Sequence, residues 1–203
     1  MPKDNSTRVW QRMLSGRRLD LLEPSALDVE IDDIAHGLAR VARWNGQTSG
    51  NHAFSVAQHS VLVWEIFCKQ QKDPTGDQQL ITLLHDAPEY VVGDMISPFK
   101  AVIGGDYKAV ENRLLAAIHM RYSLTPETPQ TLKKAIKKAD SISAYFEATL
   151  LAGFSQEEAA KFFGRPRGFS PDMFDITPLP PQCAQTQFLN AFEKIEMQRK
   201  NER

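Results

Sequence analysis

Three well-separated stretches of the chain place histidine and aspartate among apolar residues. His59 lies in HSVLVWEIF, His85 and Asp86 lie side by side in LLHDAPEY, and Asp140 lies in KKADSISAYF. An aspartate amid apolar neighbours needs a partner, because carboxylates are almost never fully buried without one. A metal ion is the partner that also employs the adjacent histidine. These four residues are therefore candidate metal ligands.

The candidate ligands offer two imidazole nitrogens and two carboxylate groups. This set suits Mn, Co, Fe, Zn or Ni and suits Ca less, so the ligand types alone do not select the metal. A bound divalent ion lowers the pKa of its water from about 15.7 toward about 7 and polarises a phosphoryl oxygen. The chemistry that this site favours is therefore hydrolysis.

The elements that carry these residues are predicted to be helices. No stretch shows the sustained alternation of a half-buried strand, whereas apolar residues recur at helical spacing in several segments. We therefore expect an all-α fold with the long helix 130–151 at its centre, and Ser49 or Asn51 as the cap of the second helix. The expected helices span residues 31–42, 53–69, 78–93, 106–121 and 130–151.

The last third of the chain is expected to wrap around this bundle. A short helix is predicted over 156–163, and the segment 164–181 contains five prolines and two glycines, which exclude regular structure. Phe169, Phe174 and Ile176 indicate that this Pro-rich segment packs onto the protein. A closing amphipathic helix follows over 182–203. We expect one domain over residues 1–203, with its core at about 31–163.

Composition excludes several classes of protein. The 203 residues carry 24 Lys and Arg against 25 Asp and Glu, a net charge of -1, so neither a nucleic-acid polymer nor an anionic membrane is expected as a partner. No run of about 18 apolar residues and no secretory signal is evident, which predicts a soluble cytoplasmic protein. Cys68 and Cys183 have no CxxC partner and are expected to be reduced thiols.

His59, the His85–Asp86 doublet and Asp140 resemble the H…HD…D signature of the HD superfamily of metal-dependent phosphohydrolases. The surrounding motifs resemble the bacterial 5'-deoxynucleotidase (YfbR-like) branch, with its Arg-Trp pair, a Glu after the doublet, and Gly-Asp followed by Pro and Lys. The matching residues here are Arg43, Trp44, Glu89, Gly93, Asp94, Pro98 and Lys100. The resemblance covers residues 31–152 and implies an all-α HD-domain helical bundle.

The resemblance also implies a role for each matching residue. The metal ligands would be His59, His85, Asp86 and Asp140. Glu89 would be the catalytic carboxylate near the attacking water, and a helix continuing through 85–89 would aim it at the same ion. Arg43 would hold the phosphate with its bidentate fork, Trp44 would face the nucleoside, and Asp94 would bind the sugar hydroxyls.

Other polar residues receive plainer interpretations. This chain has Gln58 where the branch commonly has Glu, and its Arg-Trp pair lies one residue further from the first histidine. Both departures concern loop geometry and substrate choice. His36, Arg40 and His52 are interpreted as ordinary polar residues. A basic run on the long helix is predicted to be a solvated face; its members are Lys133, Lys134, Lys137 and Lys138.

These expectations combine into one predicted activity. The chain would hydrolyse (deoxy)nucleoside 5'-monophosphates to nucleoside and phosphate by attack of metal-bound water, with Glu89 taking or relaying the proton. The cofactor would be one divalent ion, drawn from Mn, Co, Fe, Zn, Ni or Mg. The expected partners are a small nucleotide substrate and a second copy of the chain, in a homodimer.

Three alternatives stay open on sequence grounds. The same site could hydrolyse a signalling nucleotide, such as a guanosine polyphosphate or a cyclic nucleotide. The chain could instead be a non-catalytic nucleotide sensor, although the intact ligand set argues against this. A di-iron oxygenase would need further ligands, which His36, His52 and His119 do not obviously supply. Base and sugar preference and the physiological metal are not determined.

Overall fold

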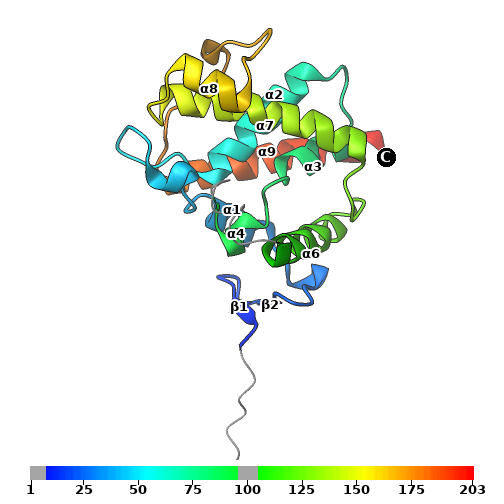
Figure 1. Ribbon diagram of the computed structural model, residues 1–203. Coiled ribbons are helices and arrows are strands. Elements are labelled where there is room, and N and C mark those ends of the chain that lie inside the picture. Colours follow the sequence, from blue (N-terminus) through cyan, green and yellow to red (C-terminus); the bar gives the residue numbers. More distant parts are fainter. Residues whose placement is uncertain (1–7, 96–104) are drawn as a thin grey trace, which may run out of the picture.

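The computed structural model describes residues 8–95 and 105–203 and is predominantly helical (Figure 1). The all-α class is thus confirmed. Its helices are α1 (Ile31–Leu38), α2 (Val56–Gln70), α3 (Gly76–Leu83), α4 (Glu89–Val92), α6 (Gly105–Arg121), α7 (Gln130–Leu150), α8 (Gln156–Phe163) and α9 (Pro181–Glu202). The shorter elements are the 3-10 turns η1 (Ala26–Asp28), η2 (Arg43–Gly46) and η3 (Pro171–Met173), and the antiparallel pair β1 (Trp10–Arg12) and β2 (Arg18–Asp20). Across the described ranges, no helix is both long and apolar enough to cross a membrane. Pro98 and Lys100 lie outside the described residues.

Helix α2, rather than the expected α7, lies at the centre of the bundle. It packs against α7, α3 and α9, and side chains are buried on nearly every side of it from Val56 to Phe67. Every residue from Val56 to Phe67 except Glu65 is buried, the polar Gln58, His59 and Ser60 included, so other elements cover α2 on nearly all sides. The basic outer face of α7 instead leaves that helix on the surface of the bundle, between α2 and α8.

The start of α2 also differs from the expectation. Its N-cap is Ser55, whose hydroxyl accepts a hydrogen bond from the Gln58 amide, and not Ser49 or Asn51. A β-bridge between Ala42 and Ser55 brings the two ends of the preceding loop together and fixes where the helix can begin. The loop of residues 43–54 is therefore closed at the start of α2.

The helix expected over 78–93 is interrupted. Helix α3 ends at Leu83, residues 84–88 form turns, and α4 begins at Glu89. Pro88 explains the break, because it has no N–H to donate to the preceding turn and its ring disfavours a helical conformation at Ala87. The His85–Asp86 doublet consequently lies in a turn between two helices, and Gly93 ends the second of these at φ 77°.

The Pro-rich segment wraps over the bundle as predicted. Gln58 Nε2 donates to the Thr177 carbonyl oxygen at 2.9 Å, and Gln58 Oε1 accepts from the Leu179 amide at 3.1 Å. The amide of Gln58 donates one of these bonds and accepts the other, whereas an ionised glutamate at this position could only accept. Helix α9 follows and packs against α1, α2 and α3.

Candidate functional site

The structure brings the four candidate metal ligands together from three elements. His59 lies in the buried middle of α2, the His85–Asp86 doublet lies in the turn after α3, and Asp140 lies on α7. Ligand atoms of His59, His85 and Asp140 all lie within 4.8 Å of one another. Asp86 Oδ2 completes the group at 3.4 Å from His59 Nε2 and 3.3 Å from His85 Nε2.

The spacing of these atoms fits a divalent ion. Among the described residues, the buried Nε2 atoms of His59 and His85 have no hydrogen-bond partner. The carboxylate oxygens of Asp86 and Asp140 approach His59 Nε2 at 3.4 and 3.5 Å. Two atoms that each lie about 2.1 Å from one ion, at octahedral or tetrahedral angles, are separated by about 3.0 to 3.4 Å. The cluster could therefore hold a metal.

Both histidines present the same nitrogen to this cluster. His85 Nδ1 lies 2.9 Å from the Thr82 carbonyl oxygen, which can only accept, so Nδ1 carries the proton and Nε2 has a free lone pair. His59 Nδ1 lies 2.6 Å from Glu147 Oε1. Hydrogen bonds behind each ring thus orient Nε2 toward the cluster.

The electrostatics of the cluster favour a positive charge at its centre. Burial and Arg43 lower the pKa of His59, but Glu147 and Asp86 outweigh them and raise it to about 10. Burial opposes ionisation of Asp86, yet His85 and His59 hold its pKa well below the usual range. A metal ion at His59 Nε2 would replace a proton that the surrounding carboxylates already stabilise.

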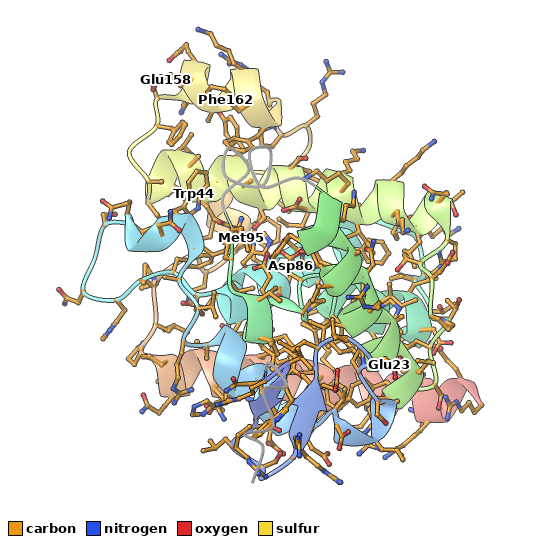
Figure 2. The ribbon with its side chains drawn as sticks, turned by 60° about the horizontal axis from the view of Figure 1, so that its bottom comes forward. Glu23, Trp44, Asp86, Met95, Glu158 and Phe162 are labelled. Atoms are coloured by element: carbon orange, nitrogen blue, oxygen red, sulfur yellow. The ribbon has the colours of Figure 1, made fainter. Side chains whose placement is uncertain are left out.

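A cleft of about 630 Å³ opens beside the cluster. One end is charged, and the other is aromatic and lies under α8. Figure 2 shows Trp44 and Met95 between Phe162 of α8 and Asp86. The lining residues are Arg43, Trp44, Asp86, Glu89, Asp94, Met95, Lys137, Asp140, Ser141, Ala144, Phe154, Phe162 and Phe163. This volume is in the range of small-molecule sites.

The residues with expected substrate roles all line this cleft. Arg43 is mostly buried, and its Nη1 donates to Asp94 Oδ2 at 3.0 Å. The Trp44 ring contacts Phe154 and Phe163 at centroid distances of 5.6 and 5.9 Å. Arg43 and Asp94 are thus paired with each other, a contact that their separate expected roles did not include.

Glu89 and Lys137 reach the cleft in ways that the sequence did not indicate. Glu89 is buried at the first position of α4, so it is aimed by the turn after Asp86 and not by a continuous helix. Lys137 is 76% exposed, as a solvated lysine would be, but its Nζ lies 2.7 Å from Asp140 Oδ2 and it lines the cleft. Its neighbours Lys134 and Lys138 are exposed and do not line the cleft.

Sequence reasoning missed Glu147 altogether. This residue lies on α7 two turns after Asp140, and its side chain is fully buried. It accepts hydrogen bonds from His59, Ser143, Arg43 and Trp44. The signal that could have found it is a carboxylate on the same helix face as Asp140, at a spacing of seven residues.

The remaining polar candidates lie outside the cleft. Arg40 Nη1 donates to the His36 carbonyl oxygen and to Gln185 Oε1, and with the exposed His52 it lines a separate cavity of about 110 Å³. His119 is buried, and its Nδ1 lies 2.9 Å from the Thr125 carbonyl oxygen. His36, Arg40 and His52 do not line the cleft of about 630 Å³, and their interpretation as ordinary polar residues stays a prediction.

A helical bundle that gathers two histidines and two aspartates beside a cleft has the architecture of an HD-type hydrolase. The family model described as 5'-deoxynucleotidase YfbR-like matches residues 34–158, and the chain belongs to this family. An uncharacterized protein of Rhodobacter capsulatus is 57% identical over 159 residues, covering 78% of this chain and 81% of that protein. The uncharacterized protein YfdR of Escherichia coli is 30% identical over 173 residues, covering 85% and 88%.

Proposed function

We propose that the chain is a metal-dependent phosphomonoesterase that hydrolyses (deoxy)nucleoside 5'-monophosphates to nucleoside and inorganic phosphate. The observation that carries this proposal is the polarity of the cleft. Its charged end adjoins the His59, His85, Asp86 and Asp140 cluster, and its other end is aromatic. A nucleotide has the same polarity, with a phosphate at one end and a planar base at the other.

His59, His85, Asp86 and Asp140 would hold one divalent ion, drawn from Mn, Co, Fe, Zn, Ni or Mg. When bound, such an ion lowers the pKa of water and neutralises charge on a phosphoryl oxygen. The aspartates and the hydrogen-bonded histidines contribute by keeping four ligand atoms in place before any ion arrives.

Among the described residues, two cations line the cleft and are available to the phosphate. Arg43 commits Nε and one Nη1 hydrogen to carboxylates, which leaves three of its five N–H donors for a ligand in the cleft. Lys137 commits one of its three donors to Asp140 Oδ2 and has two left. Charge-assisted hydrogen bonds from both would hold the phosphate dianion and stabilise the charge that develops as the ester bond breaks.

Glu89 would accept a proton from the attacking water. It lines the cleft beside Asp86 and Asp94, and its burial suits a group that must exchange protons with bound water and not with bulk solvent. Asp94 Oδ2 is occupied by Arg43, so its other oxygen would accept from a sugar hydroxyl.

The aromatic end of the cleft would receive the base. Trp44, Phe154 and Phe163 form a ring cluster, and Phe162 extends it toward solvent. Offset stacking on such rings is worth about 0.5 to 1.5 kcal/mol beyond the area buried, and every base offers a face for it.

A matrix of metals against nucleotides tests this function. Chelator-stripped protein is reloaded with each metal, and phosphate release is measured with nucleoside monophosphates, guanosine polyphosphates and cyclic nucleotides. Release from monophosphates in the presence of a divalent metal supports the proposal. Cleavage of another nucleotide alone would replace the substrate class, and binding without turnover would indicate a sensor.

Asp140→Asn provides the internal check on the ligand assignment. The substitution removes one negative ligand atom, and we expect lower metal content and lower hydrolysis together. Wild-type levels of both would show that the ligands are assigned wrongly. Light scattering of the same preparations tests the proposed homodimer.

A further inference from the structure

The single carboxylate of Glu147 contacts both the metal ligand His59 and the Arg43–Trp44 pair of the substrate cleft. Its Oε1 lies 2.6 Å from His59 Nδ1 and accepts from Ser143 Oγ at 2.7 Å. Its Oε2 accepts from Trp44 Nε1 at 2.9 Å and from Arg43 Nε at 3.2 Å. The side chain has no exposure to solvent, so protein donors on four different residues replace the water that a free carboxylate would bind.

Such a buried carboxylate is retained at a cost, which its donors must offset. Moving one charge into a protein interior is unfavourable unless a partner and hydrogen bonds compensate it. Glu147 has such partners, because both of its oxygens accept hydrogen bonds and one of the donors is the Arg43 guanidinium.

On the metal side, Glu147 determines which nitrogen of His59 faces the cluster. A carboxylate can only accept, so the short contact requires a proton on Nδ1 and leaves Nε2 as the atom that can bind metal. Nε2 is also the atom that lies near Asp86 and Asp140. The orientation and tautomer of the first predicted ligand therefore both depend on Oε1.

On the other side, Glu147 holds the Arg43–Trp44 pair. Trp44 has φ 57° and ψ 28°, a left-handed backbone that is uncommon and strained for a bulky residue. The bonds from Trp44 Nε1 and Arg43 Nε to one oxygen anchor the turn that adopts this conformation. The phosphate cation and the aromatic wall of the cleft are thereby positioned together.

We propose that Glu147 is a positioning residue that sets the metal-binding nitrogen of His59 and the Arg43–Trp44 pair at the same time, so that metal binding is coupled to the geometry of the substrate cleft. This inference rests on the metal site of the proposed function, and not on its substrate or reaction. A change in the position of Glu147 would therefore affect both the His59 ligand and the Trp44 wall of the cleft.

Glu147→Gln is the first test, because it keeps the shape and removes one acceptor oxygen. Either the amide N–H₂ faces His59 and forces its proton onto Nε2, or it faces Arg43 and Trp44 and opposes their donors. We expect the Zn²⁺ affinity of the chelator-stripped chain, measured by competition with a chromogenic chelator, to fall about 10- to 100-fold. We also expect the indole Nε1–H resonance of Trp44, assigned with Trp44→Phe, to shift.

Two further variants separate this role from a general loss of packing. Glu65→Gln makes the same chemical change at a half-buried position on α2 outside the site, and should leave Zn²⁺ affinity within about twofold of wild type. Ser143→Ala removes one of the four donors and should lower the affinity by less than Glu147→Gln does. A folded Glu147→Gln chain with wild-type Zn²⁺ affinity and an unmoved Trp44 resonance would overturn the proposal.

The wild-type chain supplies a test that does not depend on a variant folding. In the Zn²⁺-loaded protein, long-range ¹H–¹⁵N spectra of His59 should show a protonated Nδ1 and a metal-bound Nε2, and Zn²⁺ addition should move the Trp44 indole resonance. Coordination through Nδ1, or an indole resonance that ignores Zn²⁺, would refute the coupling. None of these measurements uses a nucleotide, so the inference can fail while hydrolysis stands, and can stand while hydrolysis fails.

Discussion

Gln58→Glu would place a carboxylate where the amide now holds the Pro-rich segment on α2. Gln58 is 4% exposed and bonds both to the Thr177 carbonyl oxygen and to the Leu179 amide. An ionised carboxylate keeps the second bond but points an oxygen at the Thr177 carbonyl. A protonated carboxyl group restores both, because its O–H can donate.

These two protonation states set a lower and an upper limit on the free energy of unfolding that Gln58→Glu loses. An unsatisfied, buried acceptor pair sets a lower limit of about 1 kcal/mol. The upper limit is the free energy needed to keep the carboxyl group protonated, about 1.36 kcal/mol for each pH unit above an unfolded-state pKa of about 4.3. At pH 7 this limit is about 3.7 kcal/mol, and at pH 5 it is about 1 kcal/mol. Because burial raises the carboxyl pKa in the folded state, the loss of stability grows as the pH rises.

Urea unfolding of wild type and Gln58→Glu at both pH values measures this loss. We expect the variant to lose between about 1 and 3.7 kcal/mol at pH 7 and no more than about 1 kcal/mol at pH 5. Gln47→Glu makes the same change at an exposed loop position and should cost less than about 0.5 kcal/mol. A loss at pH 7 below about 0.5 kcal/mol, or one that is equal at the two pH values, would refute this account of Gln58.

Three further predictions concern the cleft and its support. Lys137→Met should raise KM for the nucleotide about 5- to 30-fold through loss of a charge-assisted hydrogen bond, while Lys138→Met should not; equal KM values for the two variants would contradict a phosphate contact. Phe162→Ala, at a side chain 72% exposed, should raise KM about 2- to 10-fold and leave the urea midpoint unchanged; a shifted midpoint would mean that the ring serves packing. Gly37→Ala should lower the free energy of unfolding by about 1 to 3 kcal/mol, because the new Cβ would lie 2.8 Å from Tyr90 Cβ. This clash should outweigh the higher helix propensity of alanine. A variant that is stabilised in thermal unfolding would contradict this close packing.

Where the local sequence carries its own signals, the helices could be predicted closely. Helix α8 spans Gln156–Phe163 as expected, because Ser155 and Glu158 form a capping box at its start and Gly164 ends it. Helix α7 ends within one residue of its expected bound. These signals lie within a few residues of the feature that they determine.

The errors came from features that depend on the rest of the fold. The cap of α2 is Ser55 because the chain forms a bridge there, and the break at Pro88 outweighs a continuous apolar pattern. Lys137 has the same basic sequence context as Lys134 and Lys138. It differs from them in lying on the side of α7 that lines the cleft, which the local sequence does not reveal. In sequence, Glu147 cannot be distinguished from a surface glutamate, because its hydrogen-bond donors lie on α2 and η2, far away along the chain.

The wide spacing of the predicted ligands along the chain has a thermodynamic consequence. The unfolded chain does not hold His59, His85 and Asp140 near one another, so an ion would bind the native state almost exclusively. At a free concentration one hundred times its Kd, it would add about 2.7 kcal/mol to the free energy of unfolding. Cys68 and Cys183 are free thiols and do not form a disulfide cross-link with each other. The ion would thus act as a reversible cross-link between α2, the turn after α3 and α7, and the melting temperature would report its occupancy.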